Sequence, residues 1–223
     1  AGSAIGAVFA GDLISLFIFW ELMAVASTLI VLSVNSKHAL QTSIRYFLVH
    51  VFGGTLLLVG ILAHILDSGS TTFSAMEPNS FGTILIMAGF LINAAAPPLS
   101  AWLSDAYPEA SFSGAVFLSA FTTKTAVYVL LRGFPGADIL IYIGIFMIFY
   151  GIIYALLEND MRRILAYSIV NQVGFMVTGI GIGTDMALNG VAAHAFTHII
   201  YKALLLMSAG SVLYMTEIGI RLN

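Results

Sequence analysis

Three ionisable residues, His194, His198 and Lys202, lie four positions apart within one apolar segment of the sequence. In an α-helix this spacing places all three side chains on one face, about one turn apart. Charge is costly in hydrocarbon, so titratable residues inside a membrane span usually mark a path for ions or protons. Histidine titrates near neutrality and can pass a proton through either ring nitrogen. The spacing therefore predicts a proton relay along this helix.

Two other interpretations of these three residues remain open. A pair of histidines at i and i+4 suits zinc, but no Glu follows His194 and the lysine on the same face would repel a cation. The side chains could also make structural hydrogen bonds between helices. We expect neither a metal nor a cofactor, because the chain has no cysteine, no dinucleotide fingerprint and no phosphate loop.

The composition restricts the class of protein that must position these residues. Hydrophobic residues make up 60% of the chain and charged residues only 9%, and the mean hydropathy is +1.01. Soluble domains carry roughly 25% charged residues, so this chain cannot cover a globular surface in water. We therefore expect a multi-pass membrane protein in contact with lipid. A net charge of −3 gives no reason to expect a nucleic-acid partner.

The sequence divides into about seven apolar stretches, each near the 20 residues that a membrane span requires. The predicted spans lie near 12–34, 43–66, 82–100, 112–132, 138–157, 164–182 and 187–214. Turn-forming residues separate several of them, at 35–37, 67–70, 133–136 and 158–160. No strand alternation is sustained, so a barrel is not expected. The predicted fold is a single all-α bundle over residues 1–223. We expect the chain to be a fragment of a longer subunit that begins near the end of one of its helices.

The third span contains Pro97 and Pro98, which remove two backbone donors and disfavour helix at Ala96. A helical but more polar pattern resumes over 99–110. We interpret the stretch as a broken helix whose freed carbonyls lie inside protein rather than lipid. The alternative is an ordinary helix that ends at the prolines and is followed by an interfacial segment.

The basic residues predict the orientation in the membrane. If 82–110 counts as one crossing, five basic residues fall on one side: Lys37, Arg45, Arg162, Arg163 and Arg221. Only Arg132 falls on the other side. The positive-inside rule then makes the first side cytoplasmic.

Two more ionisable residues lie inside predicted spans. Glu21 is near the middle of the first span, and an intramembrane carboxylate is usually paired, so it either takes part in ion transfer or forms a static salt bridge. Lys124 lies well inside the fourth span, where a buried lysine can load and release a proton. Snorkelling of Lys124 is less expected, because Arg132 already marks that helix end.

Further polar residues could extend the path. His50 lies deep in the second span and is a candidate auxiliary relay. Ser168, Asn171 and Gln172 give the sixth span a polar stretch that could hold water between the lysines. Packing of these groups against neighbouring helices is an equally good interpretation.

With these motifs in place, the chain resembles the antiporter-like membrane subunits shared by Mrp-type cation/proton antiporters, respiratory complex I and membrane-bound hydrogenases. The resemblance is strongest to the D-type subunits of Mrp antiporters. It rests on F-W-E-L-M (19–23), L-S-D-A-Y-P-E-A (103–110), T-T-K-T-A-V-Y (122–128), E-N-D-M-R-R-I-L-A-Y-S (158–168) and H-A-F-T-H-I-I-Y-K-A-L-L (194–205). It implies roles in proton translocation for Glu21, Lys124, His194, His198 and Lys202.

One position departs from the family pattern. The family usually has a lysine before the prolines of the broken helix, paired with the glutamate that Glu21 matches, but Asn93 occupies that position here. Glu21 therefore lacks its usual partner, and another cation would have to replace the lysine.

The resemblance implies three alternative functions. The first is proton and Na⁺ or K⁺ translocation as a subunit of a multi-subunit antiporter in the inner (plasma) membrane of a prokaryote. The second is the proton-pumping membrane arm of complex I or of a membrane-bound hydrogenase. The third is a scaffold subunit that conducts no ions, which Asn93 favours. In each case the partners are other membrane subunits, and the chain carries no catalytic chemistry of its own.

Overall fold

The computed structural model describes residues 1–34 and 36–216. Asn35, in a predicted turn, and Arg221, in the predicted orientation, lie outside the described residues. Within them the chain forms nine helices: α1 (Gly2–Phe9), α2 (Leu13–Leu32), α3 (Lys37–Ser68), α4 (Phe81–Asn93), α5 (Ala101–Glu109), α6 (Phe112–Gly133), α7 (Ile139–Leu157), α8 (Met161–Ile182) and α9 (Asp185–Thr216).

Polar side chains cap the N-terminal ends of several of these helices. Asp12 accepts a hydrogen bond from the Ser15 backbone N–H at 2.8 Å, which caps α2. Ser36 caps α3 and Ser80 caps α4 in the same way, because each side-chain oxygen satisfies an N–H that has no partner within the helix. The hydrogen bond from the Ser15 backbone N–H lowers the pKa of Asp12, whereas burial raises it. The hydrogen bond has the larger effect, so the pKa of Asp12 is lowered.

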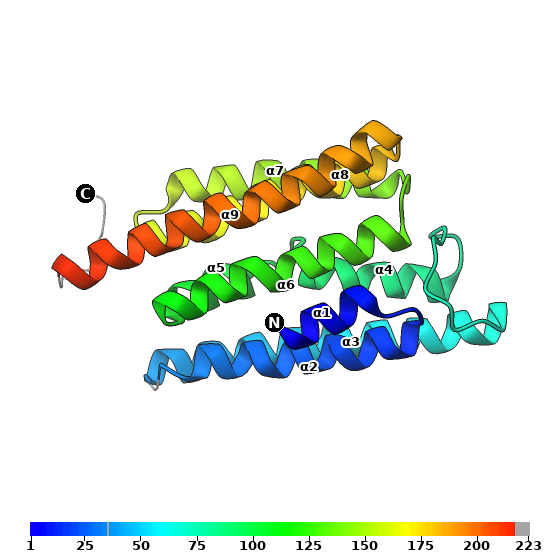
Figure 1. Cartoon of the computed structure of the whole chain (residues 1–223), viewed down its shortest axis with the longest axis horizontal. Coiled ribbons are helices and arrows are strands. Elements are labelled where there is room, and N and C mark those ends of the chain that lie inside the picture. The colour runs from blue at the N-terminus through cyan, green and yellow to red at the C-terminus, as the bar shows by residue number, and fades with distance from the viewer. Residues whose placement is uncertain (35, 217–223) are drawn as a thin grey trace.

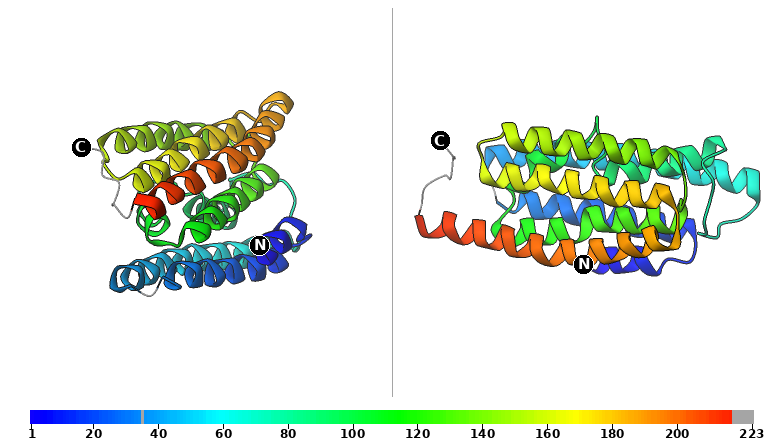
Figure 2. Two further views of the ribbon diagram at one scale, coloured as in Figure 1. Left: turned by 60° about the vertical axis from the view of Figure 1, so that its left-hand side comes forward. Right: turned by 90° about the horizontal axis from the view of Figure 1, so that it is seen from above.

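The helices form three stacked layers (Figure 1, Figure 2). One layer holds α1, α2 and α3, the middle layer holds α4, α5 and α6, and the third holds α7, α8 and α9. Helix α3 packs on α4, and α6 packs on both α8 and α9, so the middle layer contacts both outer layers. Six of the described helices are long and apolar enough to cross a membrane, and α4 is a shorter apolar helix. The prediction of an all-α membrane bundle with about seven crossings is confirmed.

The remaining crossing, in addition to the six long helices, is the broken helix that was predicted as the third span. Helix α4 ends at Asn93, and α5 begins at Ala101 after a non-helical segment that contains Pro97 and Pro98. The ring N–H of Trp102 donates to the Ile92 carbonyl at 3.0 Å, and the Ala95 backbone N–H donates to the same oxygen near the end of α4. Helix α5 packs against α3, α6 and α8.

The Trp102 hydrogen bond leads to a prediction about stability. Trp102→Phe keeps an aromatic ring in this buried position but leaves the Ile92 carbonyl without that donor. Because the Ala95 backbone N–H still donates to this carbonyl, the change removes one hydrogen bond, which contributes about 0.5–1.5 kcal/mol. We expect the free energy of unfolding, measured by denaturant titration in detergent, to fall by this amount. Tyr142→Phe, at a 70% exposed position, is the control and should change it little.

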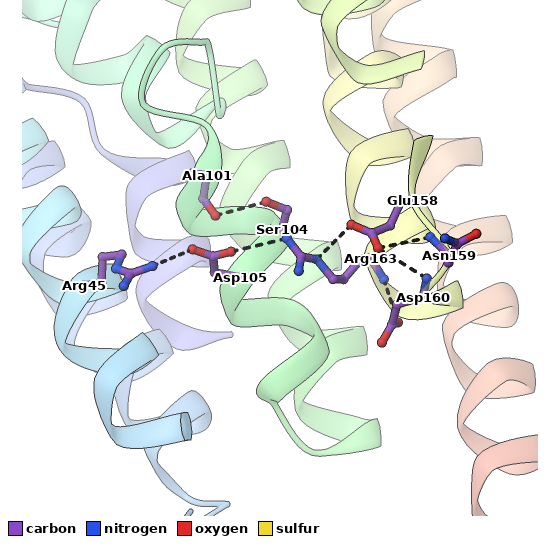
Figure 3. A network of polar contacts seen from close by, with 8 residues as sticks. All are labelled: Arg45, Ala101, Ser104, Asp105, Glu158, Asn159, Asp160 and Arg163. Carbon is purple, nitrogen blue, oxygen red and sulfur yellow. Dashed lines mark hydrogen bonds and ion pairs between the residues drawn. The ribbon is translucent and has the colours of Figure 1, made fainter. Parts of the chain in front are cut away.

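An ion-pair network ties the first and third layers together through α5 (Figure 3). Asp105 lies 3.0 Å from Arg45 of α3 and 3.8 Å from Arg163 of α8. Arg163 also lies 3.2 Å from Glu158, which follows α7. These side chains are partly exposed, and such pairs usually contribute little stability. They also show that α5 lies between the N-terminal parts of α3 and α8, at one end of the bundle.

Basic residues lie at both ends of the bundle, but unequally. Lys37 begins α3 and Arg162 lies in the first turn of α8, at the end of the bundle that holds the network. Arg132 lies at the other end, where it donates to the carbonyls of Ala10 at 2.7 Å and Phe73 at 3.0 Å.

Candidate ion-translocation site

The polar residues of α9 line the face that packs against α6 and α8. His198 is fully buried and Lys202 is only 3% exposed, whereas Phe196 on another face of the helix is 66% exposed. His194 is half-buried. His194, His198 and Lys202 therefore lie on one side of α9, as predicted, and this side is directed at the other helices.

Helix α8 supplies partners to both ends of this face. Lys202 Nζ donates to the Ser168 hydroxyl, which in turn donates to the Leu165 carbonyl at 3.0 Å. His194 Nε2 lies 2.8 Å from Gln172 Oε1. Ser168 and Gln172 are four residues apart on α8, so two helices present matching polar positions to one another.

His198 lies between these two contacts. Its ring centroid is 6.1 Å from that of His194 and 5.0 Å from that of Tyr201. Neither ring nitrogen of His198 has a hydrogen-bond partner among the described side chains and backbone groups. Buried polar groups are normally hydrogen-bonded, so this imidazole is available for exchangeable partners.

Lys124 of α6 approaches the same region from the middle layer. It is 6% exposed, and its Nζ donates to the neighbouring Thr123 hydroxyl at 3.1 Å. Lys124 is close enough to Lys202 and to His198 for their charges to interact. A groove of ≈ 230 Å³ between α1 and α6 reaches Lys124, and Ala4, Val8 and Tyr128 also line it.

Glu21 and Asn93 form a second polar cluster in the first two layers, away from the lysines. Both side chains are directed at a pair of glycines on α3. A Cβ atom on Gly54 would collide with the Glu21 carboxylate, and one on Gly53 would lie 3.7 Å from Asn93 Oδ1. Within residues 1–34 and 36–216, neither Glu21 Oε1 nor either amide atom of Asn93 has a hydrogen-bond partner.

His50 lies one turn before this glycine pair. Its Nδ1 is 2.9 Å from the Tyr46 carbonyl oxygen. Its ring stacks on that of Tyr46 with the centroids 4.0 Å apart and meets that of Trp102 edge-on with the centroids 4.6 Å apart. The structure places His50 beside the broken helix and not in hydrogen-bond contact with Lys124 or Lys202.

Asn171 turns away from the lysines and toward α7. Its Nδ2 donates to the Ile148 carbonyl at 2.9 Å, and its Oδ1 accepts from Gln172 Nε2 at 3.0 Å. Asn171 therefore packs α8 on α7 and orients the Gln172 side chain that contacts His194.

Sequence reasoning missed a cluster of buried hydroxyls between α2, α3, α5 and α6. Tyr46 donates to Ser27 at 2.9 Å, and Tyr107 donates to the Leu118 carbonyl at 2.9 Å. The Thr122 side chain lies close to both tyrosines. The cluster joins the Glu21 part of the bundle to the helix that carries Lys124. The sequence signal was the run of threonines around Lys124, and it was weak because the tyrosines come from other helices.

Metal ligation requires several suitable side chains in one place. Among the described residues there is no group of three or more His, Cys, Asp or Glu side chains placed to hold a metal ion. The site consists of single titratable groups linked by neutral polar side chains, which suits the transfer of protons or the binding of alkali cations.

Comparison with known proteins places the chain in a family. Residues 10–221 match the family model described as NADH:quinone oxidoreductase/Mrp antiporter, transmembrane. The chain is 31% identical to the D-type subunit of the Na(+)/H(+) antiporter of Alkalihalophilus pseudofirmus, over 92% of this chain and 46% of that protein. It is also 31% identical to the M-type subunit of the NADH-quinone oxidoreductase of Escherichia coli K12, over 95% of this chain and 47% of that one.

Two solved structures share the fold. A chain of the Mrp complex from Dietzia sp. superposes with a TM-score of 0.87 at 28% identity, covering 96% of this chain and 25% of that one. A chain of the archaeal membrane-bound sulfane sulfur reductase superposes with a TM-score of 0.89 at 26% identity. The match covers 98% of this chain and 49% of that one. The chain spans about half the length of the curated relatives it matches.

Proposed function

The chain belongs to the NADH:quinone oxidoreductase/Mrp antiporter transmembrane family, and we propose that it is the central part of an ion-translocating subunit in an Mrp-type antiporter. In this role it carries protons across the membrane in exchange for Na⁺ or K⁺, together with other membrane subunits. The positive-inside distribution supports a cytoplasmic location for the end with Asp105, in the inner membrane of a prokaryote.

The observation that carries this proposal is the set of buried titratable groups on α6 and α9, to which α8 adds neutral polar partners. Lys124, His198 and Lys202 are each at most 6% exposed, and no described carboxylate forms an ion pair with any of them. A structural salt bridge would need such a partner. Groups with no fixed counter-charge at this depth are suited to gaining and losing protons.

The geometry supports a sequence of proton transfers. A proton on Lys124 and one on Lys202 repel each other, so loading of one lysine favours release from the other. His198 lies between the polar ends of this face, and its free ring nitrogens can accept a proton on one side and donate one on the other. We propose that water molecules connect His198 to the two lysines. His194 and Gln172 would then extend the path toward the start of α9.

Glu21 acts on this path through charge rather than contact in our proposal. Ser27 of α2, the helix that carries Glu21, accepts from Tyr46 of α3, and Tyr46 lies close to Thr122 of α6, the helix that carries Lys124. A change in the charge of Glu21 alters the electrostatic potential at Lys124, because a low-dielectric interior screens weakly.

A second candidate function is the proton-pumping arm of a redox complex. It is favoured by the 31% identity to an NADH-quinone oxidoreductase subunit and by the structural similarity to a sulfane sulfur reductase chain. The membrane chemistry would be the same and only the driving reaction would differ. Proton uptake driven by a Na⁺ gradient, without a redox substrate, supports the antiporter; a strict requirement for a reductant supports the redox complex.

The test of the relay is His198→Phe in the complete complex, reconstituted in vesicles that contain a pH-sensitive dye. Phe fills a similar volume but cannot carry a proton, so we expect proton flux to fall about 100-fold. The control is Phe196→Leu on the exposed face of α9, which should keep the wild-type flux. Undiminished flux in His198→Phe would contradict the relay, and no flux in the wild type would support the scaffold alternative.

A further inference from the structure

We infer that Glu21, Asn93 and the C-terminal end of α4 form a binding site for one alkali cation, Na⁺ or K⁺. The inference rests on the proposed function, since it assigns the exchanged cation to the second polar cluster and leaves the lysines to the protons.

The geometry brings neutral and charged oxygens to one place. Glu21 comes from α2 and Asn93 from the end of α4, and both approach the adjacent glycines Gly53 and Gly54 of α3. Because neither glycine has a side chain, the Glu21 carboxylate occupies the space beside Gly54, and the Ile92 side chain and the Asn93 amide lie beside Gly53. Asn93 is 1% exposed, and its Oδ1 and Nδ2 have no partner among the described groups.

The helix break leaves free backbone acceptors at the end of α4 that carries Asn93. In a continuous helix the carbonyls of Asn93 and Ala94 would accept from the residues four positions later, but these are Pro97 and Pro98, which have no N–H. The C-terminal end of a helix also carries a partial negative charge. Interrupted membrane helices commonly coordinate Na⁺ through such unwound carbonyls. The hydroxyl of Ser100, 2% exposed and also without a described partner, lies just after the break.

The charge of the cluster selects the class of ion. Glu21 supplies a single negative charge, and no ion pair within the described residues neutralises it. A monovalent cation would bring the net charge to zero, whereas a divalent ion would leave one positive charge in an apolar environment. His50 lies one turn away on α3, but no group of three or more His, Cys, Asp or Glu side chains gathers among the described residues, which disfavours a transition metal.

Asn93 is the residue that makes this site possible. A lysine at this position would place its ammonium against the carboxylate and would take the space of the ion. An amide offers an oxygen ligand instead and carries no charge. With asparagine at position 93 the cluster has no lysine ammonium, so a cation that enters and leaves can balance the charge of Glu21.

The test measures cation binding by the complete complex, using radioactive Na⁺ and, separately, K⁺. Glu21→Gln removes the charge but keeps the shape, and Asn93→Lys supplies the ammonium. Each variant should bind one cation fewer per subunit, or bind it at least ~10-fold more weakly. Ser43→Ala is the control, because Ser43 is a buried α3 residue whose hydroxyl donates to the Leu40 carbonyl of its own helix.

The outcomes separate this site from the proton path. Equal binding of both cations by wild type, Glu21→Gln and Asn93→Lys would overturn the cation site, as would infrared spectra showing Glu21 protonated at neutral pH with saturating Na⁺ and K⁺. Loss of proton flux in His198→Phe with cation binding retained would leave both proposals standing. Wild-type cation binding without proton flux would instead contradict the proposed function while keeping the site.

Discussion

Lys202→Arg is expected to abolish proton translocation while leaving the charge at this position unchanged. Arginine cannot release its proton in a protein, whereas lysine can. If Lys202 takes up and gives off protons, the flux of the reconstituted complex should fall by about 100-fold or more. If Lys202 acts only as a fixed positive charge, the arginine variant should keep most of the flux.

Two further variants make this result interpretable. Lys202→Met removes the charge at nearly constant length and should lose flux as fully as Lys202→Arg. Lys37→Arg, at an exposed position at the start of α3, should behave as wild type. Because arginine is larger and must displace the Ser168 contact, complex assembly is checked by size-exclusion chromatography before flux is compared.

Gly174→Leu is expected to cause the largest loss of stability, because α7 and α8 cross with backbone against backbone. A Cβ on Gly174 would lie 2.8 Å from the Gly144 carbonyl oxygen and 2.8 Å from the Ile148 amide nitrogen. Small residues allow membrane helices to approach this closely. Overpacking there should cost about 3 kcal/mol in the free energy of unfolding, measured by denaturation in mixed micelles.

The same change should also disturb the site. Gln172, two residues before Gly174, contacts His194, and Asn171 bonds the Ile148 carbonyl of α7. A displaced α8 would break these contacts. Gly190→Leu is the matched control, since a Cβ on Gly190 meets nothing within 4 Å. Equal stability of the Gly174 and Gly190 variants would show that the α7–α8 contact is not as tight as described.

Local sequence signals were sufficient to predict the fold. Hydropathy located the spans, and Pro97 with Pro98 located the break, because a missing N–H acts on the residue itself and its near neighbours. The shared face of His194, His198 and Lys202 followed from helical spacing alone. The basic residues predicted which helix ends lie together, although only the structure showed that Asp105 joins Arg45 to Arg163.

The partners within the site could not be predicted in the same way. Spacing placed Ser168, Asn171 and Gln172 on one helix but did not show that Asn171 turns to α7. The cluster of Ser27, Tyr46, Thr122 and Tyr107 draws on four helices, and nothing local relates them. Asn93 was recognised as a departure from the family pattern, but its approach to the same glycine pair as Glu21 depends on how α2 and α4 pack on α3.

The two polar clusters draw on different helices of the bundle and share only its middle layer. The lysines and histidines occupy α6 and α9, and the carboxylate with its amide occupies α2 and α4. Protons and alkali cations would then use separate sites in one bundle, coupled by charge through the hydroxyls of Tyr46 and Thr122.

Proton transfer as proposed depends on a hydrated path that joins Lys124, His198 and Lys202 inside the bundle. An experimental map of the complete complex that resolves ordered water tests it most directly. We predict water molecules within hydrogen-bond distance of both His198 ring nitrogens and of both lysine amines. A map that shows these groups separated by closely packed apolar side chains, with no water between them, would contradict it.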